Sequence, residues 1–228
     1  MNERVTSHLN LAKLRKLLDA DPVRYAPGLY RKHGKRALDV LLVLISAVPT
    51  VLILLPLMAL IALDGRAPIY TQKRLGKGGR SFRMFKLRTM VADADMILDD
   101  YLDKNPEARA EWDETQKLKH DPRITFFGRF LRKSSLDELP QLLNVLFGQM
   151  SIVGPRPMME GQENLYPGRA YFAMRPGITG FWQISERNQS SFSQRAEYDT
   201  LYYRQLSFGA DCRVIAETVR VVFKATGY

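Results

Sequence analysis

Residues 40–63 read VLLVLISAVPTVLILLPLMALIAL, and this uncharged stretch decides how the rest of the chain is arranged. As a helix it would be about 36 Å long, which is enough to cross a hydrocarbon layer of about 30 Å. It is too long, and begins too far into the chain, to be a cleavable signal peptide. The stretch therefore predicts a segment that lies in a membrane.

Both flanks of this stretch are strongly basic. Residues 1–36 carry nine Lys and Arg against three acidic residues, and residues 64–90 carry eight against Asp64 alone. Because basic flanks favour the cytoplasmic side of a membrane, a single straight span satisfies only one of them. We therefore expect a re-entrant segment that enters the membrane, bends and returns. An ordinary span and a buried helix of a soluble protein are the alternatives.

Two prolines mark where this segment could bend. Pro49 and Pro56 each remove an amide donor and clash with the carbonyl four residues earlier. Ser46 and Thr50 lie close enough along the chain to bind the freed backbone groups. The sequence therefore predicts a helix, a break at one of these prolines, and a second helix.

The chain is expected to have three parts. Residues 1–34 form a basic, amphipathic extension suited to anionic membrane lipids, residues 35–64 form the membrane hairpin, and residues 65–228 form a compact cytosolic catalytic domain. Asp39 follows two basic residues at helical spacing, so an interfacial salt bridge with one of them is expected.

Composition limits the partners. The formal net charge is +10 and the pI is about 9.8, which favours anionic partners such as nucleotides or anionic lipids. No helix-turn-helix, RNP or zinc pattern is present, so nucleic acid is not expected to be a partner. The single cysteine, Cys212, excludes an internal disulfide and a thiolate metal cluster.

The pattern after residue 64 is typical of a mixed domain. Residues 68–72 and 81–88 flank a glycine-rich turn and predict a β-hairpin whose second strand carries basic side chains. Residues 91–119 are charge-rich and predict two solvated helices separated near Pro106. We therefore expect an α/β fold that is mostly helical with a small β-hairpin or sheet.

Two adjacent carboxylates, Asp137 and Glu138, lie in the segment SSLDELPQ at residues 134–141. Leucines at helical spacing from position 136 to 146 predict one apolar face of a helix that begins here. Ser135 and Glu138 match a capping box, in which case Asp137 would only complement the helix dipole. Taken alone, the segment favours this structural interpretation.

The same geometry also supports a catalytic interpretation. The positive helix end, Arg132 and Lys133 would favour the ionised form of Asp137, and an ionised aspartate can attack phosphorus. Glu138 could then help to hold Mg²⁺ against diphosphate oxygens.

Attack by a carboxylate on a phosphate requires cations that neutralise the repulsion. Residues 153–157, VGPRP, fix an arginine between two prolines as a clamp for a phosphate or a planar base. Residues 175–183, RPGITGFWQ, form a turn-rich loop that ends in aromatics able to stack. A tight structural turn is the alternative for both loops. The candidate cations are Lys86, Arg88, Arg132, Arg156, Arg175 and Arg187.

The order of these motifs resembles the bacterial sugar transferase family, the small monotopic phosphoglycosyl transferases. KRALD precedes the apolar segment, and YTQKR, FKLRTM, LRKSSLDELPQLLNVL, MSIVGPRP and RPGITGFWQI follow it, from about Lys35 to the C-terminus. The resemblance implies transfer of a hexose-1-phosphate from a UDP-sugar to polyprenyl phosphate, usually undecaprenyl phosphate, with release of UMP. It places the enzyme at the cytoplasmic face of the bacterial inner membrane, at the first membrane step of exopolysaccharide synthesis.

The resemblance also implies residue roles. Asp137 would be the nucleophile that forms a covalent phospho-aspartate, with Mg²⁺ held by Glu138 together with Asp137. Pro56 matches the family's membrane break and Pro49 is an additional candidate. The substrate-binding residues would be Lys86, Arg88, Arg132, Pro155, Arg156, Pro157, Arg175, Gln183, Arg187, Asp199 and Asp211.

Some properties stay open at this point. The resemblance favours galactose or glucose as the sugar, and the oligomeric state, a homo-oligomer included, is not determined. A non-catalytic membrane scaffold is one rival. A conventional glycosyltransferase with a Rossmann-type core is another, with Asp93 and Asp95 as its Asp-x-Asp motif.

Overall fold

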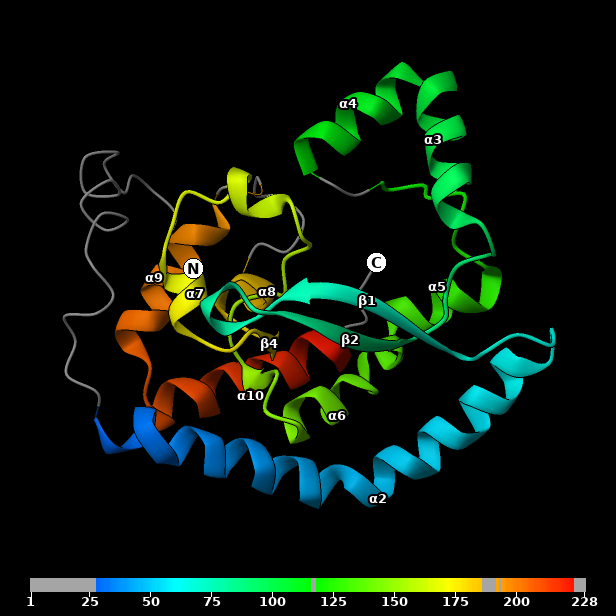
Figure 1. Ribbon diagram of the computed structural model, residues 1–228. Coiled ribbons are helices and arrows are strands. Elements are labelled where there is room, and N and C mark those ends of the chain that lie inside the picture. The colour runs from blue at the N-terminus through cyan, green and yellow to red at the C-terminus, as the bar shows by residue number, and fades with distance from the viewer. Residues whose placement is uncertain (1–27, 116–117, 186–191, 193, 224–228) are drawn as a thin grey trace, which may run out of the picture.

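The structure, a computed structural model, describes residues 28–115, 118–185, 192 and 194–223. Most of the expected N-terminal extension, residues 1–27, lies outside this range. The described residues are mostly helical, with two small sheets (Figure 1). The elements are η2 (Tyr30–Gly34), α2 (Lys35–Ala62), β1 (Ile69–Leu75), η3 (Lys77–Gly79), β2 (Ser81–Leu87), α3 (Ala94–Lys104), α4 (Pro106–Thr115), α5 (Phe126–Lys133), η4 (Leu136–Glu138), α6 (Gln141–Leu146), β3 (Ser151–Val153), η5 (Gln162–Leu165), α7 (Ala170–Ala173), β4 (Gly177–Thr179), α8 (Phe181–Ser185), α9 (Arg195–Gln205) and α10 (Phe208–Phe223).

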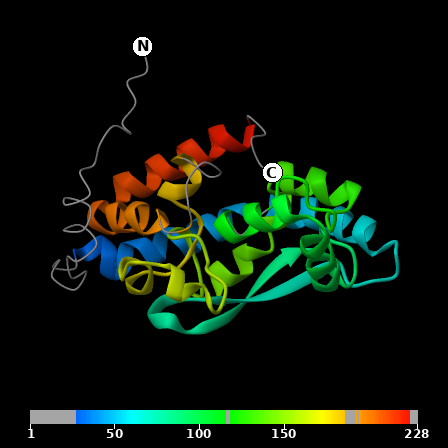
Figure 2. The same cartoon turned by 90° about the horizontal axis from the view of Figure 1, so that it is seen from above.

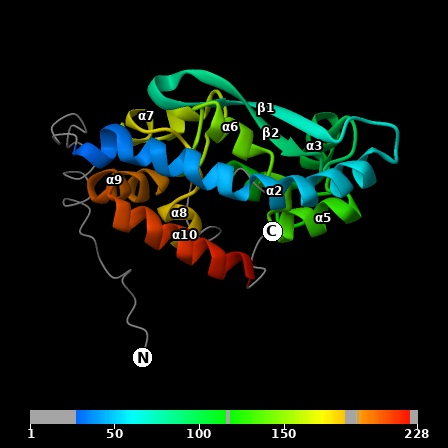
Figure 3. The same ribbon diagram turned by 90° about the horizontal axis from the view of Figure 1, so that it is seen from below.

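Helix α2 contains the apolar stretch and runs along one side of the molecule, with the β1–β2 hairpin on one side of it and α10 on the other (Figure 3). It is long and apolar enough to cross a membrane, and only 6% of its most apolar window is buried inside the protein. Val48 and Leu52, for example, are 69% and 68% exposed. The alternative of a buried core helix is therefore wrong, since a core helix would hide such side chains.

The expected break into two helices is not present. Helix α2 is continuous from Lys35 to Ala62, with Pro49 and Pro56 inside it. Figure 1 shows that the helix is bent near its middle and that both halves turn toward the body of the protein. An interior proline removes one hydrogen bond and displaces one carbonyl, while the turns on either side keep theirs, so the helix bends without ending. The re-entrant placement in a membrane stays a prediction.

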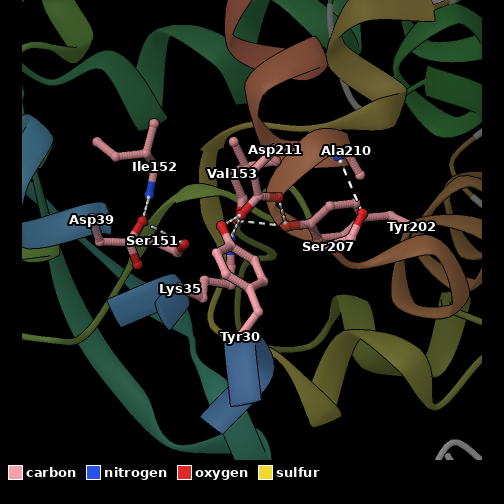
Figure 4. A network of polar contacts seen from close by, with 10 residues as sticks. All are labelled: Tyr30, Lys35, Asp39, Ser151, Ile152, Val153, Tyr202, Ser207, Ala210 and Asp211. Atoms are coloured by element: carbon pink, nitrogen blue, oxygen red, sulfur yellow. Dashed lines mark hydrogen bonds and ion pairs between the residues drawn. The ribbon is translucent and has the colours of Figure 1, made fainter. Parts of the chain in front are cut away.

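The expected interfacial salt bridge between Asp39 and a preceding basic residue is also not formed. Its carboxylate is 3% exposed and accepts hydrogen bonds from Ser151 Oγ and Ile152 N, each at 2.9 Å (Figure 4). Lys35 instead binds Asp211. Asp39 therefore joins the start of α2 to β3, because burial requires partners that fill the acceptor sites of a carboxylate.

Strands β1 and β2 form the predicted antiparallel hairpin, in register from Ile69 opposite Leu87 to Leu75 opposite Ser81. The hairpin lies on one side of the molecule and α9 and α10 lie on the other (Figure 2). The two predicted helices of residues 91–119 are confirmed as α3 and α4, which project from the body (Figure 1). Pro106 is the first residue of α4, a position where the missing amide hydrogen has no helical partner anyway.

Strands β3 and β4 form a parallel pair that joins the VGPRP and RPGITG motifs. Gly154 N donates to Thr179 O and Gly177 N donates to Pro155 O, both at 2.8 Å. A Cβ at Gly177 would lie 2.1 Å from the nitrogen of Gly154, so only glycine permits this approach. The two loops are therefore one structural unit.

Among the described residues the only sheets are these two pairs of strands. A Rossmann-type core needs several parallel strands with helical crossovers, whereas the described part of the chain has a single parallel pair, β3 and β4, of three residues each. Asp93 and Asp95 lie at the start of α3, on the projecting arm. These observations contradict the conventional glycosyltransferase alternative.

Candidate active site

The segment that carries Asp137 and Glu138 does not form the expected capping box. Ser135 has a left-handed backbone (φ 56°), and its side chain makes no capping hydrogen bond. Asp137 and Glu138 belong to the short 3₁₀ helix η4, and α6 begins only at Gln141. Pro140 explains the late start, because it has no amide hydrogen and suits the first positions of a helix.

The expected apolar face of this segment is also different. Leu143 and Leu146 are 48% and 39% exposed, whereas Gln141 and Asn144 are buried. The Asn144 side chain accepts from Phe85 N at 3.0 Å and donates to the carbonyl of Arg83 at 2.7 Å. These bonds fix α6, and with it the dyad, against strand β2.

Asp137 and Glu138 share one cation. Lys86 Nζ lies 3.3 Å from Asp137 Oδ2 and 2.9 Å from Glu138 Oε1. Asp137 is 5% exposed, and burial raises its pKa above the ordinary value, while Lys86 and Arg132 oppose the rise. The expectation that basic neighbours dominate is therefore corrected. Burial has the larger effect, and Lys133 is exposed.

Two predicted arginines lie close to the dyad. Arg132 Nε donates to Thr89 Oγ1 at 2.9 Å, and the charge of Arg132 acts on Asp137. Arg156 Nη1 lies 4.0 Å from Glu138 Oε1. Pro155 and Pro157 on either side of Arg156 are buried, as a clamp that holds this arginine would require. The structure therefore brings Lys86, Arg132 and Arg156 to the two carboxylates.

Sequence reasoning missed two arginines beside Arg156. Arg195, the first residue of α9, is 8% exposed, and its Cζ lies 4.3 Å from the centroid of the Trp182 ring. Arg74 on β1 donates to Gln72 Oε1 at 2.6 Å. Burial lowers the pKa of Arg195 to about 9 and that of Arg74 to about 10, with Arg156 contributing to both shifts. Arg74 lies within YTQKR, so its motif was a signal, whereas Arg195 follows no recognised pattern.

Trp182 does not offer an open face for stacking. It is 2% exposed, and Arg156 and Arg195 both lie against its ring, with Arg156 Cζ 5.8 Å from the ring centroid. A tryptophan face favours such cations. Trp182 therefore orients guanidinium groups, which corrects the expectation of a stacking aromatic. Gln183 beside it is buried in α8, and Arg187 lies outside the described residues.

Three predicted residues have structural partners. Arg88 donates to both carboxylate oxygens of Asp64, at 2.7 and 2.6 Å, and to the carbonyl of Ile61, so it holds the end of α2. Arg175 Nε donates to Gly148 O at 2.8 Å. Asp199 accepts from Tyr166 Oη at 2.8 Å inside the fold.

Asp211 lies in a buried network away from the dyad. It is 1% exposed and accepts from Tyr30 Oη, Lys35 Nζ and Tyr202 Oη, at 2.6, 2.7 and 2.6 Å (Figure 4). These donors come from the N-terminal helical segment and from α9. The network therefore joins that segment to the C-terminal helices.

The donor set of the dyad fits a magnesium ion that is completed by substrate. In the described part of the chain no group of three or more His, Cys, Asp or Glu could hold a metal. Magnesium is commonly bound by one or two carboxylates together with waters and substrate phosphates. Asp137 and Glu138 supply two such carboxylates side by side.

Comparisons with known proteins show which family the chain belongs to. The sequence pattern of the family described as "Bacterial sugar transferase" matches residues 30–225. The chain is 45% identical over 202 residues to the "UDP-galactose-lipid carrier transferase" of Erwinia amylovora, covering 86% of this chain and 42% of that protein. It is 43% identical over 197 residues to "Exopolysaccharide production protein ExoY" of Rhizobium meliloti, covering 85% and 87%. It is 40% identical over 198 residues to the "Undecaprenyl-phosphate galactose phosphotransferase" of Salmonella typhimurium, covering 85% and 41%.

Proposed function

Because the chain belongs to the bacterial sugar transferase family, we propose that it transfers a hexose-1-phosphate from a UDP-sugar to polyprenyl phosphate and releases UMP. Undecaprenyl phosphate is the proposed acceptor, since it is named in a relative 40% identical to this chain. Galactose is the proposed sugar, since it is named in that relative and in the one from Erwinia amylovora. The product would begin exopolysaccharide assembly.

The observation that carries the proposal is the position of Asp137. This carboxylate lies next to Lys86, with Arg132 and Arg156 near the dyad. A carboxylate can act as a nucleophile toward phosphorus, and cations around it reduce the repulsion between two anions. The arrangement suits attack on a phosphoryl group better than a purely structural role.

Two displacements complete the proposed reaction. In the first, an oxygen of Asp137 forms a bond to the sugar-linked phosphorus, and the bond from that phosphorus to UMP breaks, so that UMP leaves with the electron pair. In the second, an oxygen of polyprenyl phosphate attacks the same phosphorus, and the acyl-phosphate bond breaks. Asp137 is restored as a carboxylate, and the product is a polyprenyl diphosphate sugar.

The side chains around the dyad have separate roles in the proposed reaction. Lys86 holds both carboxylates in place and favours the ionised form of Asp137 against the effect of burial. Arg132 and Arg156 are positioned to neutralise phosphoryl oxygens. A magnesium ion held by Asp137 and Glu138 would add positive charge at the diphosphate.

The proposed location is the cytoplasmic face of the bacterial inner membrane. Helix α2 is bent and has strongly basic flanks, which favours a re-entrant position with both ends in the cytoplasm. Anionic lipids would attract the same flanks. Arg88 and Asp64 then hold the end of α2 next to strand β2, which carries Lys86.

A labelling experiment tests the covalent route. Full-length protein in detergent micelles is incubated with UDP-galactose labelled in the β-phosphate, with Mg²⁺ and without lipid acceptor. Label is expected to become bound to the protein, and undecaprenyl phosphate is expected to release it. Asp137→Asn should abolish both labelling and UMP release, whereas Asp99→Asn, an exposed change on α3, should alter neither. Full turnover by Asp137→Asn would contradict the covalent route.

A further inference from the structure

We propose that Arg74 and Arg195 form a preformed subsite for the nucleotide-side phosphate of the donor, the phosphate that leaves within the nucleoside monophosphate. The inference rests on the proposed function and goes beyond it, because it assigns the leaving group to two arginines outside the Asp–Glu dyad. Three observations support it: burial, the order of residues along the hairpin, and the absence of contacting counterions within the described part of the chain.

Arg195 is a buried charge that has no counterion in contact among the residues described by the structure. Its Cζ lies 4.3 Å from the Trp182 ring centroid and 4.5 Å from the Phe192 ring centroid. Among the residues that the structure describes, no carboxylate lies within ion-pair distance of it, and its buried Nε has no hydrogen-bond partner. Burying a charge in this state is costly, so a ligand that completes the site would recover that cost.

Arg74 is also only partly satisfied by the residues that the structure describes. One terminal nitrogen donates to Gln72 Oε1, and the other lies 3.4 Å from the carbonyl of Pro157. Its Nε is buried and has no partner within the described residues, and no carboxylate pairs with its guanidinium there. Gln72 and Pro157 therefore orient Arg74 without neutralising it.

Arg156 lies close to both arginines, because it contacts the same Trp182 ring as Arg195 and because Arg74 lies 3.4 Å from the carbonyl of the next residue, Pro157. Burial makes the largest contribution to the lowered pKa of Arg74 and of Arg195, and repulsion from Arg156 is next for each. Arg74 also lowers the pKa of Arg195. Two largely buried guanidinium groups that are repelled by the half-buried Arg156 favour an anion between them.

The charges around the dyad leave a positive excess. In the described part of the chain, six cations act on one another or on four carboxylates at this site. The cations are Arg74, Lys86, Arg123, Arg132, Arg156 and Arg195, and the carboxylates are Asp121, Asp137, Glu138 and Asp199. A diphosphate brings the negative charge that this excess favours.

The order along the hairpin indicates which phosphate Arg74 binds. Lys86, next to Asp137, is opposite Tyr70, whereas Arg74 is opposite Phe82, four residues farther along. This places the backbone of Arg74 about 13 Å from that of Tyr70, toward the hairpin turn. Figure 1 shows the turn near α7 and the other end of the hairpin near the end of α2. In an in-line displacement the leaving oxygen lies opposite the attacking one, so the phosphate on the far side of the reacting phosphorus from Asp137 belongs at Arg74 and Arg195.

The test measures binding of UMP and of inorganic pyrophosphate by calorimetry to the full chain in detergent micelles. Arg74→Met and Arg195→Met remove the charge and keep a long apolar stem. Each should weaken UMP binding by about 10- to 100-fold, the size of a lost charge-assisted hydrogen bond. The KM for undecaprenyl phosphate should not change. Arg80→Met, an exposed change in the turn of the same hairpin, should leave both quantities at the wild-type value.

A structural role predicts a different result. Removing an uncompensated buried charge should leave the melting temperature of the ligand-free protein unchanged or raise it, whereas loss of a structural contact lowers it. Arg195→Lys keeps the charge and should retain more UMP affinity than Arg195→Met. UMP binding within threefold of wild type in both Met variants overturns the inference, and so does a raised KM for undecaprenyl phosphate with unchanged UMP binding.

The same measurements separate this inference from the proposed function. Loss of UMP and pyrophosphate binding in the Met variants, together with full turnover by Asp137→Asn, would support the subsite and contradict the covalent route. Normal labelling of Asp137 with unaffected UMP binding in both Met variants would support the covalent route and overturn the subsite.

Discussion

Lys35, the first residue of α2, binds Asp211 of α10, with 2.7 Å between the ammonium nitrogen and the carboxylate oxygen. The two residues are 176 positions apart in the chain. Asp211 also accepts from Tyr30 and Tyr202, so the start of the apolar helix is fixed to the C-terminal helices. The bent apolar helix and the body of the protein are thereby held as one unit.

Asp211→Ala is expected to destabilise the protein by about 3–5 kcal/mol, because it leaves the Lys35 charge and two hydroxyls without their buried acceptor. Thermal melting of the full chain should show the loss, and Glu217→Gln, which removes an exposed ion pair with Arg220, should not. At a temperature where the variant is folded, the KM for the UDP-sugar should equal that of wild type. A raised KM there would show that Asp211 contacts substrate.

Lys86→Met is expected to lower the rate of covalent labelling by about 100-fold or more. This is the size of effect seen when an enzyme loses a group that stabilises charge at the reacting centre. The physical reason is that Lys86 counteracts the rise in the pKa of Asp137 that burial causes. Without Lys86, a larger fraction of Asp137 is protonated, and the protonated form cannot attack phosphorus. Labelling rates measured from acidic to alkaline pH should shift to higher pH in this variant. Lys77→Met in the exposed turn is the matched control, and an unshifted profile in Lys86→Met would contradict this role.

Asp199 is expected to make stability depend on pH. Burial raises its pKa from 3.8 to about 7, so between these values the folded protein binds more protons than the unfolded chain. The free energy of unfolding contributed by this group therefore falls as pH rises through that range. Asp199→Asn keeps an acceptor for Tyr166. As pH rises from 3.8 to about 7, the free energy of unfolding of this variant should increase relative to that of wild type by on the order of 1 kcal/mol per pH unit. Urea unfolding at several pH values checks this, and a constant difference between the two proteins would contradict it.

Gly177→Ala is expected to prevent the close approach of the VGPRP and RPGITG loops. The added Cβ would lie 2.1 Å from the nitrogen of Gly154, and a backbone atom cannot move aside as a side chain can. We expect a loss of stability of more than about 3 kcal/mol and a loss of UMP binding, since Arg156 is held by the same unit. Gly209→Ala in α10 is the control, because nothing lies within 4 Å of its Cβ. Wild-type melting and binding by Gly177→Ala would contradict the argument.

The bend of α2 can be tested through its prolines. Replacing both Pro49 and Pro56 with alanine restores the missing hydrogen bonds and should straighten the helix. A straight helix would carry one basic flank across the membrane, so a protease site placed near residue 1 should become accessible from the outer side of spheroplasts. Each single variant then shows which proline maintains the bend. Accessibility that is already present in the parent chain would contradict the re-entrant placement.

Local sequence patterns predicted several elements correctly. The turn signals gave the hairpin, Pro106 separated α3 from α4, and the uncharged stretch gave α2. Each of these depends on residues near one another in the chain, where periodicity and proline geometry act directly. The same patterns misplaced the start of α6 and predicted a capping box, because Pro140 and the bonds of Asn144 to strand β2 determine where that helix begins.

The sequence alone determined the long apolar helix, the hairpin and the presence of an Asp–Glu pair beside basic residues, since composition and short-range periodicity specify these features. Only the tertiary structure decided which charges meet. It directed Arg88 to Asp64, enclosed Asp211 among three donors, and placed Arg156 and Arg195 over one tryptophan. The reason is physical: a polar side chain takes the partner that burial leaves within a few ångströms, and that distance is set by packing between segments far apart in the chain.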